Sequence, residues 1–109
     1  MRTFSEFQII GHVGKVHMVG QTLRITISAE YGKKDEEGRF VSKPYWNEVT
    51  IFKTSRYDWI KKNISAGDLV IAMGTMRQTN YDKDGQTIYT VTLAADEFDL
   101  LAKKANAAA

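Results

Sequence analysis

The chain has 109 residues, of which 43% are hydrophobic, a formal net charge of +2 and no cysteine. This length suits one domain with a single core, and the lack of cysteine excludes disulfides, thiolate metal sites and cysteine nucleophiles. The start MRTFSEFQII has no long apolar segment, and no run approaches the roughly 18 apolar residues of a membrane span, so we expect a soluble, cytoplasmic protein.

The first strand pattern covers residues 4–19, where apolar residues are interrupted by Gly11 and Gly14. Glycines inside a strand often mark a bend or a bulge, so we expect one long, irregular strand. His12 and His17 are five positions apart, which places them on opposite faces unless a bulge intervenes. We therefore expect no metal site at this pair.

The second strand pattern is the clearest in the chain. Residues 22–30 alternate strictly between apolar and polar side chains, and the predicted inward set is Leu23, Ile25, Ile27 and Ala29. Residues 32–44 then contain two glycines, the only proline and seven charges. This composition predicts a long mobile loop or the tip of an extended hairpin.

The third strand pattern, KPYWNEVTIF at 43–52, carries bulky apolar groups on both faces. Val49 and Ile51 are expected to face the core. Trp46 and Phe52 then lie on the opposite face, because strand side chains alternate. A Trp on a strand is more often packed than exposed, so this face requires an explanation.

Residues 54–63 change to helical spacing and predict a short helix, capped by Thr54 or Ser55 and ending near Lys61 and Lys62. The spaced apolar residues are Tyr57, Ile60 and Ile64. Trp59 is expected to pack with them against the floor or one end of the fold.

Two further strands are predicted after a turn at Gly67, joined by the hairpin turn DKDG at 82–85. In the fourth strand the expected inward set is Leu69, Ile71 and Met73. A bulge near Gly74 would then turn Arg77 and Tyr81 outward. Residues 96–109 are expected to form a short docking segment and a frayed end.

Three strands, a helix and two strands predict an all-β domain, a five-stranded Greek-key OB-fold barrel with one short helix between strands 3 and 4. An SH3-like barrel is the nearest competitor, but it does not normally place a helix there. We expect the domain to cover residues 1–102, with a disordered C-terminal end at 103–109.

The outward aromatic residues and neighbouring cations indicate binding of single-stranded nucleic acid, because bases stack on aromatic rings and cations hold phosphates. Trp46, Phe52, Lys53, Arg77 and Tyr81 form this set. Tyr31, Lys33 and Lys34 are further candidates. Tyr31 shares the parity of inward residues unless the strand kinks, and the two lysines either follow a nucleic-acid backbone or solvate their loop.

Glu48, between Trp46 and Phe52, does not fit this hypothesis, because a carboxylate repels phosphate. No carboxylate pair, phosphate loop or nucleophile elbow is recognisable in the sequence. We therefore expect no enzyme activity, no cofactor and no metal.

Read in order, five segments resemble the bacterial-type single-stranded DNA-binding proteins. They are FQIIGHVG, LRITISAEY, YWNEVTIF, ISAGDLVIAMGTMR and NYDKDGQTIYTVTLAADEFDLL, which together span about residues 4–101. Each motif alone is weak, but the ordered set is specific. The resemblance implies sequence-tolerant binding of single-stranded DNA in replication, recombination or repair, close to the nucleoid.

By this resemblance, the base-stacking residues fall on Tyr31, Trp46, Phe52 and Tyr81, and Arg77 takes a phosphate-contacting position. It also implies homo-oligomers, with tetramers more common than dimers, formed partly by pairing of first strands. Family members usually end in an acidic tip that recruits other proteins, whereas this sequence ends in KKANAAA. Partner proteins are therefore not assigned, and a primosomal-type OB-fold module that mainly docks proteins is the alternative function.

Overall fold

The computed structural model describes residues 2–104. Within them the chain forms five strands, one α-helix and a single 3-10 turn before the helix. In chain order these are β1 (Glu6–Val19), β2 (Thr22–Lys34), β3 (Phe40–Ile51), η1 (Thr54–Arg56), α1 (Tyr57–Asn63), β4 (Leu69–Lys83) and β5 (Gln86–Ala102).

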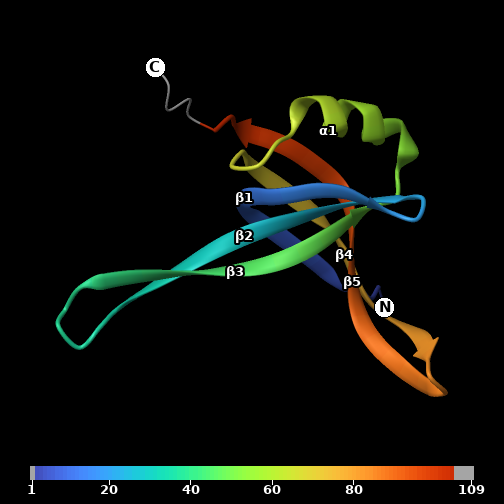
Figure 1. The fold of residues 1–109 in the computed structure, drawn as a ribbon, viewed down its shortest axis with the longest axis horizontal. Coiled ribbons are helices and arrows are strands. Elements are labelled where there is room, and N and C mark those ends of the chain that lie inside the picture. The colour runs from blue at the N-terminus through green and yellow to red at the C-terminus, as the bar shows by residue number, and fades with distance from the viewer. Residues whose placement is uncertain (1, 105–109) are drawn as a thin grey trace.

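The five strands close into one barrel in the order β1-β2-β3-β5-β4 (Figure 1). Neighbouring strands are antiparallel except for β3 and β5, whose short parallel pairing of Val49 with Leu93 and Thr50 with Ala94 completes the closure. The helix α1 lies between β3 and β4 in the chain and at one end of the barrel in space (Figure 1). The predicted OB-fold barrel is therefore confirmed.

β1 carries the predicted irregularity at Gly14. Its register against β2 shifts between Val13 and Lys15, as a bulge produces. The bulge reverses the parity of the strand, so His12, paired with Ser28, and His17, paired with Arg24, lie on the same face. The two histidines thus follow the bulged alternative of the sequence prediction.

Two long hairpins extend beyond the barrel, β2–β3 at the left of Figure 1 and β4–β5 at its lower right. Residues 32–44 are the tip of the first hairpin rather than a free loop, because β2 and β3 remain paired as far as Lys34 and Phe40. In the second hairpin, Asp84 and Gly85 form the turn with φ values of 52° and 79°. Positive φ at both turn residues fits the predicted two-residue hairpin turn.

The inward face of β4 differs from the prediction. Val70 and Ala72 are fully buried, whereas Leu69, Ile71 and Met73 are only partly buried. With this parity, Arg77 and Tyr81 face outward without any extra residue in β4. The register shift opposite Gly74 belongs instead to β5, where Asp96 is left without a partner in the ladder.

The core fills the barrel and continues beneath α1. Its fully buried members include Leu23, Ile25, Ile27, Val49, Ile60 and Val70. From the helix, Tyr57 and Ile60 face this core, and the Tyr57 hydroxyl donates a hydrogen bond of 2.6 Å to the Ile51 carbonyl. The predicted capping by Thr54 or Ser55 is wrong, since no side chain caps either η1 or α1.

Trp59, which the sequence predicts to cover the floor or one end of the fold, is packed only in part and remains 39% exposed. Its ring stacks with the Arg56 guanidinium, 4.7 Å from the ring centroid. Arg56 also donates a 2.7 Å hydrogen bond to the Phe98 carbonyl. Through Arg56, Trp59 is therefore connected to β5.

The segment predicted as a docking segment is the end of β5, which continues to Ala102. Beyond it, the Lys104 backbone N–H and the Lys103 ammonium each donate to the Asp68 carboxylate at 2.9 Å. The Ser65 N–H donates to the same carboxylate, which is 1% exposed. Residues 105–109 of the predicted disordered end lie outside the described part of the chain.

The backbone N–H groups of Lys104 and Ser65, together with the Lys103 ammonium, lower the pKa of Asp68 from 3.8 to about 2, against the opposing effect of burial. Asp68 thus fixes the end of β5 beside the loop that follows α1. No helix within residues 2–104 has the length and apolar character needed to cross a membrane.

Candidate nucleic-acid interface

The two predicted aromatic residues, Trp46 of β3 and Phe52 directly after its end, are exposed. Trp46 is 57% exposed and Phe52 52% exposed, whereas Val49 and Ile51 between them are buried. The predicted inward positions of Val49 and Ile51 and outward positions of Trp46 and Phe52 are therefore confirmed.

Gly14, at the bulge in β1, leaves room for the Trp46 ring. Gly14 lies directly beneath that ring, so that a Cβ atom at Gly14 would collide with the ring. Thr26 of β2 lies beside the same point. Absence of a side chain at position 14 therefore sets where Trp46 can lie.

A depression of about 720 Å³ separates the two hairpins, and Trp46 and Tyr81 both line it. β2 and β3 contribute Arg24, Trp46 and Glu48 to one wall, and β4 and β5 contribute Tyr81 and Thr92 to the other. Tyr81 is 52% exposed. The structure thus brings together two predicted stacking residues that are far apart in the sequence.

Phe52, Lys53 and Arg77 line an adjacent depression of about 490 Å³. The Arg77 guanidinium is held by the Thr75 hydroxyl, 3.2 Å from Nη2, and pairs with no carboxylate in the described part of the chain. An aromatic ring with two cations beside it offers one stacking surface and two phosphate contacts. Asp96 borders this depression and reduces its positive charge.

Tyr31 lies on the other face of the β2–β3 hairpin. It pairs with Lys43, and Ala29 pairs with Tyr45, so the parity places Tyr31, Lys43 and Tyr45 on the face opposite Trp46. The Tyr31 and Tyr45 rings meet edge to face at 5.8 Å, and the Lys43 ammonium lies 5.4 Å from the Tyr45 centroid. The structure therefore does not bring Tyr31 to the Trp46 depression.

Lys33 and Lys34 divide between the two faces of the same hairpin. Lys33 shares the parity of Tyr31, whereas Lys34 pairs with Phe40 on the Trp46 side. Tyr45 belongs to the Tyr31 cluster, and the sequence prediction missed it by assigning its face entirely to the core. Tyr45 directly follows the charged segment at 32–44, and this proximity was the available signal, because a hairpin that extends beyond the barrel exposes both faces.

The carboxylate of Glu48 has partners. Arg24 Nη1 lies 3.0 Å from Oε1, and His17 Nε2 lies 3.6 Å from Oε2. Arg24 pairs with Thr50 in the register and His17 pairs with Arg24, so all three side chains arise on the Trp46 face of β1, β2 and β3. The carboxylate thus compensates a cation on the same surface.

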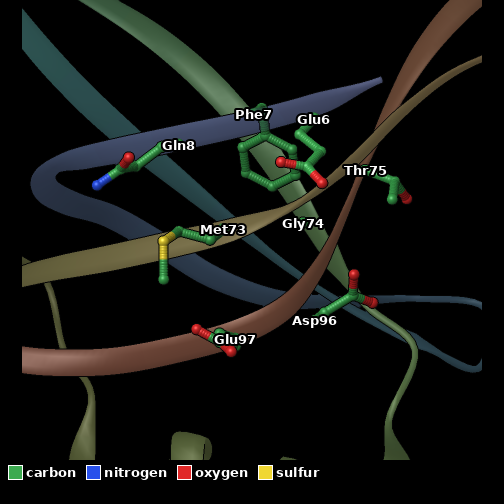
Figure 2. A pocket seen from close by; sticks show the side chains of 8 residues that line it. All are labelled: Glu6, Phe7, Gln8, Met73, Gly74, Thr75, Asp96 and Glu97. Atoms are coloured by element: carbon green, nitrogen blue, oxygen red, sulfur yellow. The ribbon is translucent and has the colours of Figure 1, made fainter. Parts of the chain in front are cut away.

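A third depression, of about 450 Å³, has an acidic lining that sequence reasoning did not find. Figure 2 shows its side chains around a point where β1, β4 and β5 meet. They are Glu6, Phe7, Gln8, Met73, Gly74, Thr75, Asp96 and Glu97, which include three carboxylates and no cation. Within residues 2–104, no group of three or more His, Cys, Asp or Glu residues is arranged to hold a metal ion.

The model of the Single-strand binding protein family matches residues 4–101. No curated protein matches the chain.

Solved structures share the fold at low sequence identity. A mitochondrial single-stranded DNA binding protein from S. cerevisiae superposes with a TM-score of 0.68 at 19% identity, covering 94% of this chain and 99% of that one. A Plasmodium falciparum protein, in complex with single-stranded DNA, gives 0.68 at 16% identity over 94% and 96%. A small single-stranded DNA-binding protein from Streptomyces coelicolor gives 0.60 at 12% identity over 91% and 95%.

Proposed function

Because the chain belongs to the single-strand binding protein family, whose model spans residues 4–101, we propose that it binds single-stranded DNA with little regard to sequence. Bases stack on Trp46 and Tyr81, and Lys53 and Arg77 contact the phosphates. Stacking is sequence-tolerant because every base has a π-face. The protein protects exposed single strands in replication, recombination or repair.

The observation that carries the binding mode is the shared depression between the hairpins. Trp46 and Tyr81 line it from opposite walls, and both rings are half exposed. Large aromatic side chains are normally buried in a domain of this size, so their joint exposure at one depression favours a ligand with flat apolar surfaces. Single-stranded DNA has such surfaces.

The neighbouring groups extend the contact beyond two bases. Phe52 offers a third ring, with Lys53 and Arg77 beside it. Tyr31 and Lys33 lie on the reverse face of the β2–β3 hairpin, so contact with them requires the strand to pass around the hairpin. Lys34 remains on the near face. We include these residues in the proposed interface as its outer part.

Titration with oligo-dT tests the proposal through tryptophan fluorescence. Both tryptophans are partly exposed, so a Trp59→Phe background isolates the Trp46 signal. Stacking quenches Trp46, and phosphate contacts make the affinity fall as salt rises. Unchanged fluorescence, or affinity that ignores salt, would contradict the proposal. Oligo-U in parallel tests RNA, because neither stacking nor phosphate contact reads the sugar.

We also infer that the protein assembles into homo-oligomers, most simply tetramers. Support comes from β1, where Ile10, Met18 and Val19 are exposed apolar side chains. Sedimentation equilibrium, with and without a long oligonucleotide, measures the mass. A mass of one chain at micromolar concentration would contradict this assembly, without affecting the stacking proposal.

A further inference from the structure

Glu48 is a carboxylate on a surface proposed to bind phosphate. Its side chain lies on the same face of β3 as Trp46 and Phe52, and it lines the depression that Trp46 and Tyr81 share. Arg24 lines that depression as well, and these two are the charged residues among its lining side chains. Their electrostatic effect on a bound strand therefore depends on whether they stay paired.

The Arg24–Glu48 pair is open to solvent. The side chains are 35% and 40% exposed, and a single N–O contact of 3.0 Å joins them. Arg24 Nε also contacts the Thr22 hydroxyl at 3.4 Å, which holds the guanidinium near the surface. An exposed pair with one contact is weak, because water and salt compete for both partners. A competing anion can therefore separate them.

A phosphate on a stacked strand is such an anion. Guanidinium groups bind phosphate oxygens through two parallel N–H donors, which the pairing with Glu48 does not use. Stacking on Trp46 holds the strand at the same depression, so its phosphates reach Arg24 at high local concentration. The carboxylate then loses its cation but remains beside His17, 3.6 Å from Nε2.

We propose that Glu48 is an exchangeable counter-charge for Arg24, which phosphate displaces when single-stranded DNA binds. In the free protein Glu48 keeps Arg24 neutralised and oriented. In the complex Arg24 is a phosphate-binding residue, and the exchange makes binding weaker than Arg24 alone would allow. This inference rests on the proposed function: within that interface, Arg24 strengthens DNA binding and Glu48 weakens it.

Three variants test the exchange: Glu48→Gln, Arg24→Gln and the double variant, with Glu97→Gln as the matched control. Glu97→Gln also removes one carboxylate, but in the acidic depression. Affinity for labelled oligo-dT is measured by anisotropy near pH 8, where histidine is ordinarily neutral. Thermal unfolding of each variant verifies that it is folded.

The exchange predicts that Glu48→Gln binds about three- to fivefold more tightly than wild type at roughly 50 mM salt. The slope of log K against log salt steepens by about 0.7, as for one more phosphate contact on a single strand. The double variant loses this gain, because Arg24 is no longer present to use it. Glu97→Gln changes affinity less than about twofold, since its carboxylate lies outside the depression.

Unchanged or weaker binding by Glu48→Gln would overturn the inference. A double variant as tight as Glu48→Gln would also overturn it, because the gain would then come from removing a repulsive carboxylate and not from freeing Arg24. Trp46→Ala distinguishes these failures from failure of the proposed function. If Trp46→Ala binds as well as wild type, the stacking interface is wrong; if it weakens binding, only the exchange is rejected.

Discussion

Two of the three depressions on the barrel differ greatly in the chemistry of their linings. The one between the hairpins has Trp46 and Tyr81 on its walls and one balanced ion pair, whereas the one at the meeting of β1, β4 and β5 has three carboxylates. A concave surface does not by itself attract a nucleic-acid strand. Under the proposed function, single-stranded DNA binds where rings stack its bases and is repelled where carboxylates gather, so side-chain chemistry rather than concavity selects the proposed binding face.

Among the substitutions that test this contrast, Trp46→Ala is expected to have the largest effect on DNA binding. Loss of one stacked base should weaken oligo-dT binding by about 1–3 kcal/mol. In the acidic depression, Glu97→Gln should change binding by less than about 0.5 kcal/mol. Anisotropy titrations at one salt concentration measure both. Equal effects of the two substitutions would show that the depressions are not functionally distinct.

The comparison also requires an intact barrel, to whose stability the ionised Asp68 carboxylate contributes. The folded pKa of about 2 lies below the unfolded value of 3.8, so the ionised Asp68 contributes stability above pH 4. That contribution, about 2 kcal/mol, is lost as pH falls from about 4 to 2. Urea unfolding across this range measures it.

Asp68→Asn should lower the free energy of unfolding at pH 7 and flatten its fall between pH 4 and 2. Glu97→Gln provides the matched carboxylate control and should leave the stability at pH 7 nearly unchanged. If the free energy of unfolding fell equally steeply between pH 4 and 2 in wild type and in Asp68→Asn, the assigned role of Asp68 would be contradicted. Binding at pH 7 should persist in both variants, since Asp68 lies beside α1 and not at either hairpin.

A smaller effect is expected from Tyr31→Ala, which asks how far the binding face extends. Tyr31 lies on the reverse side of the β2–β3 hairpin, so its loss should cost about 1 kcal/mol, and only with oligonucleotides long enough to pass around the hairpin. Titrations with short and long oligo-dT separate the cases. An equal loss with short oligonucleotides would place Tyr31 in the central contact instead.

Sequence patterns predicted the order of elements, the DKDG hairpin, an irregular first strand at Gly11 and Gly14, and the outward Trp46 and Phe52; the first hairpin was one of two alternatives for residues 32–44. These features are local, because each is indicated by a pattern of a few neighbouring residues: alternation for a strand, glycine for a bulge, and turn residues for a hairpin. The inward face of β4 was wrong because LVIAM at 69–73 is apolar on both sides, so period-2 reasoning had no polar residue to orient it. The end of β5 was not predicted as a strand, because only one of its faces is covered and its other face carries charged residues.

Contacts between residues far apart in the chain could not be predicted from the sequence. The partner of Glu48 is 24 positions away in Arg24, and the acidic depression combines residues of β1, β4 and β5. No local spacing relates such positions, since the barrel register decides which of them meet. The parity of Tyr31 already indicated the face on which it lies. Its contact with Tyr45 could not be predicted without knowing that the hairpin extends beyond the barrel.

The glycine beneath the Trp46 ring has a consequence for reading mutational data. In a selection for loss of binding, substitutions at Gly14 should be recovered together with those at Trp46, since any Cβ there displaces the ring. Gly14 itself offers no side chain to a ligand. A map of sensitive positions would therefore mark it as part of the interface, although its contribution is the space that it leaves empty.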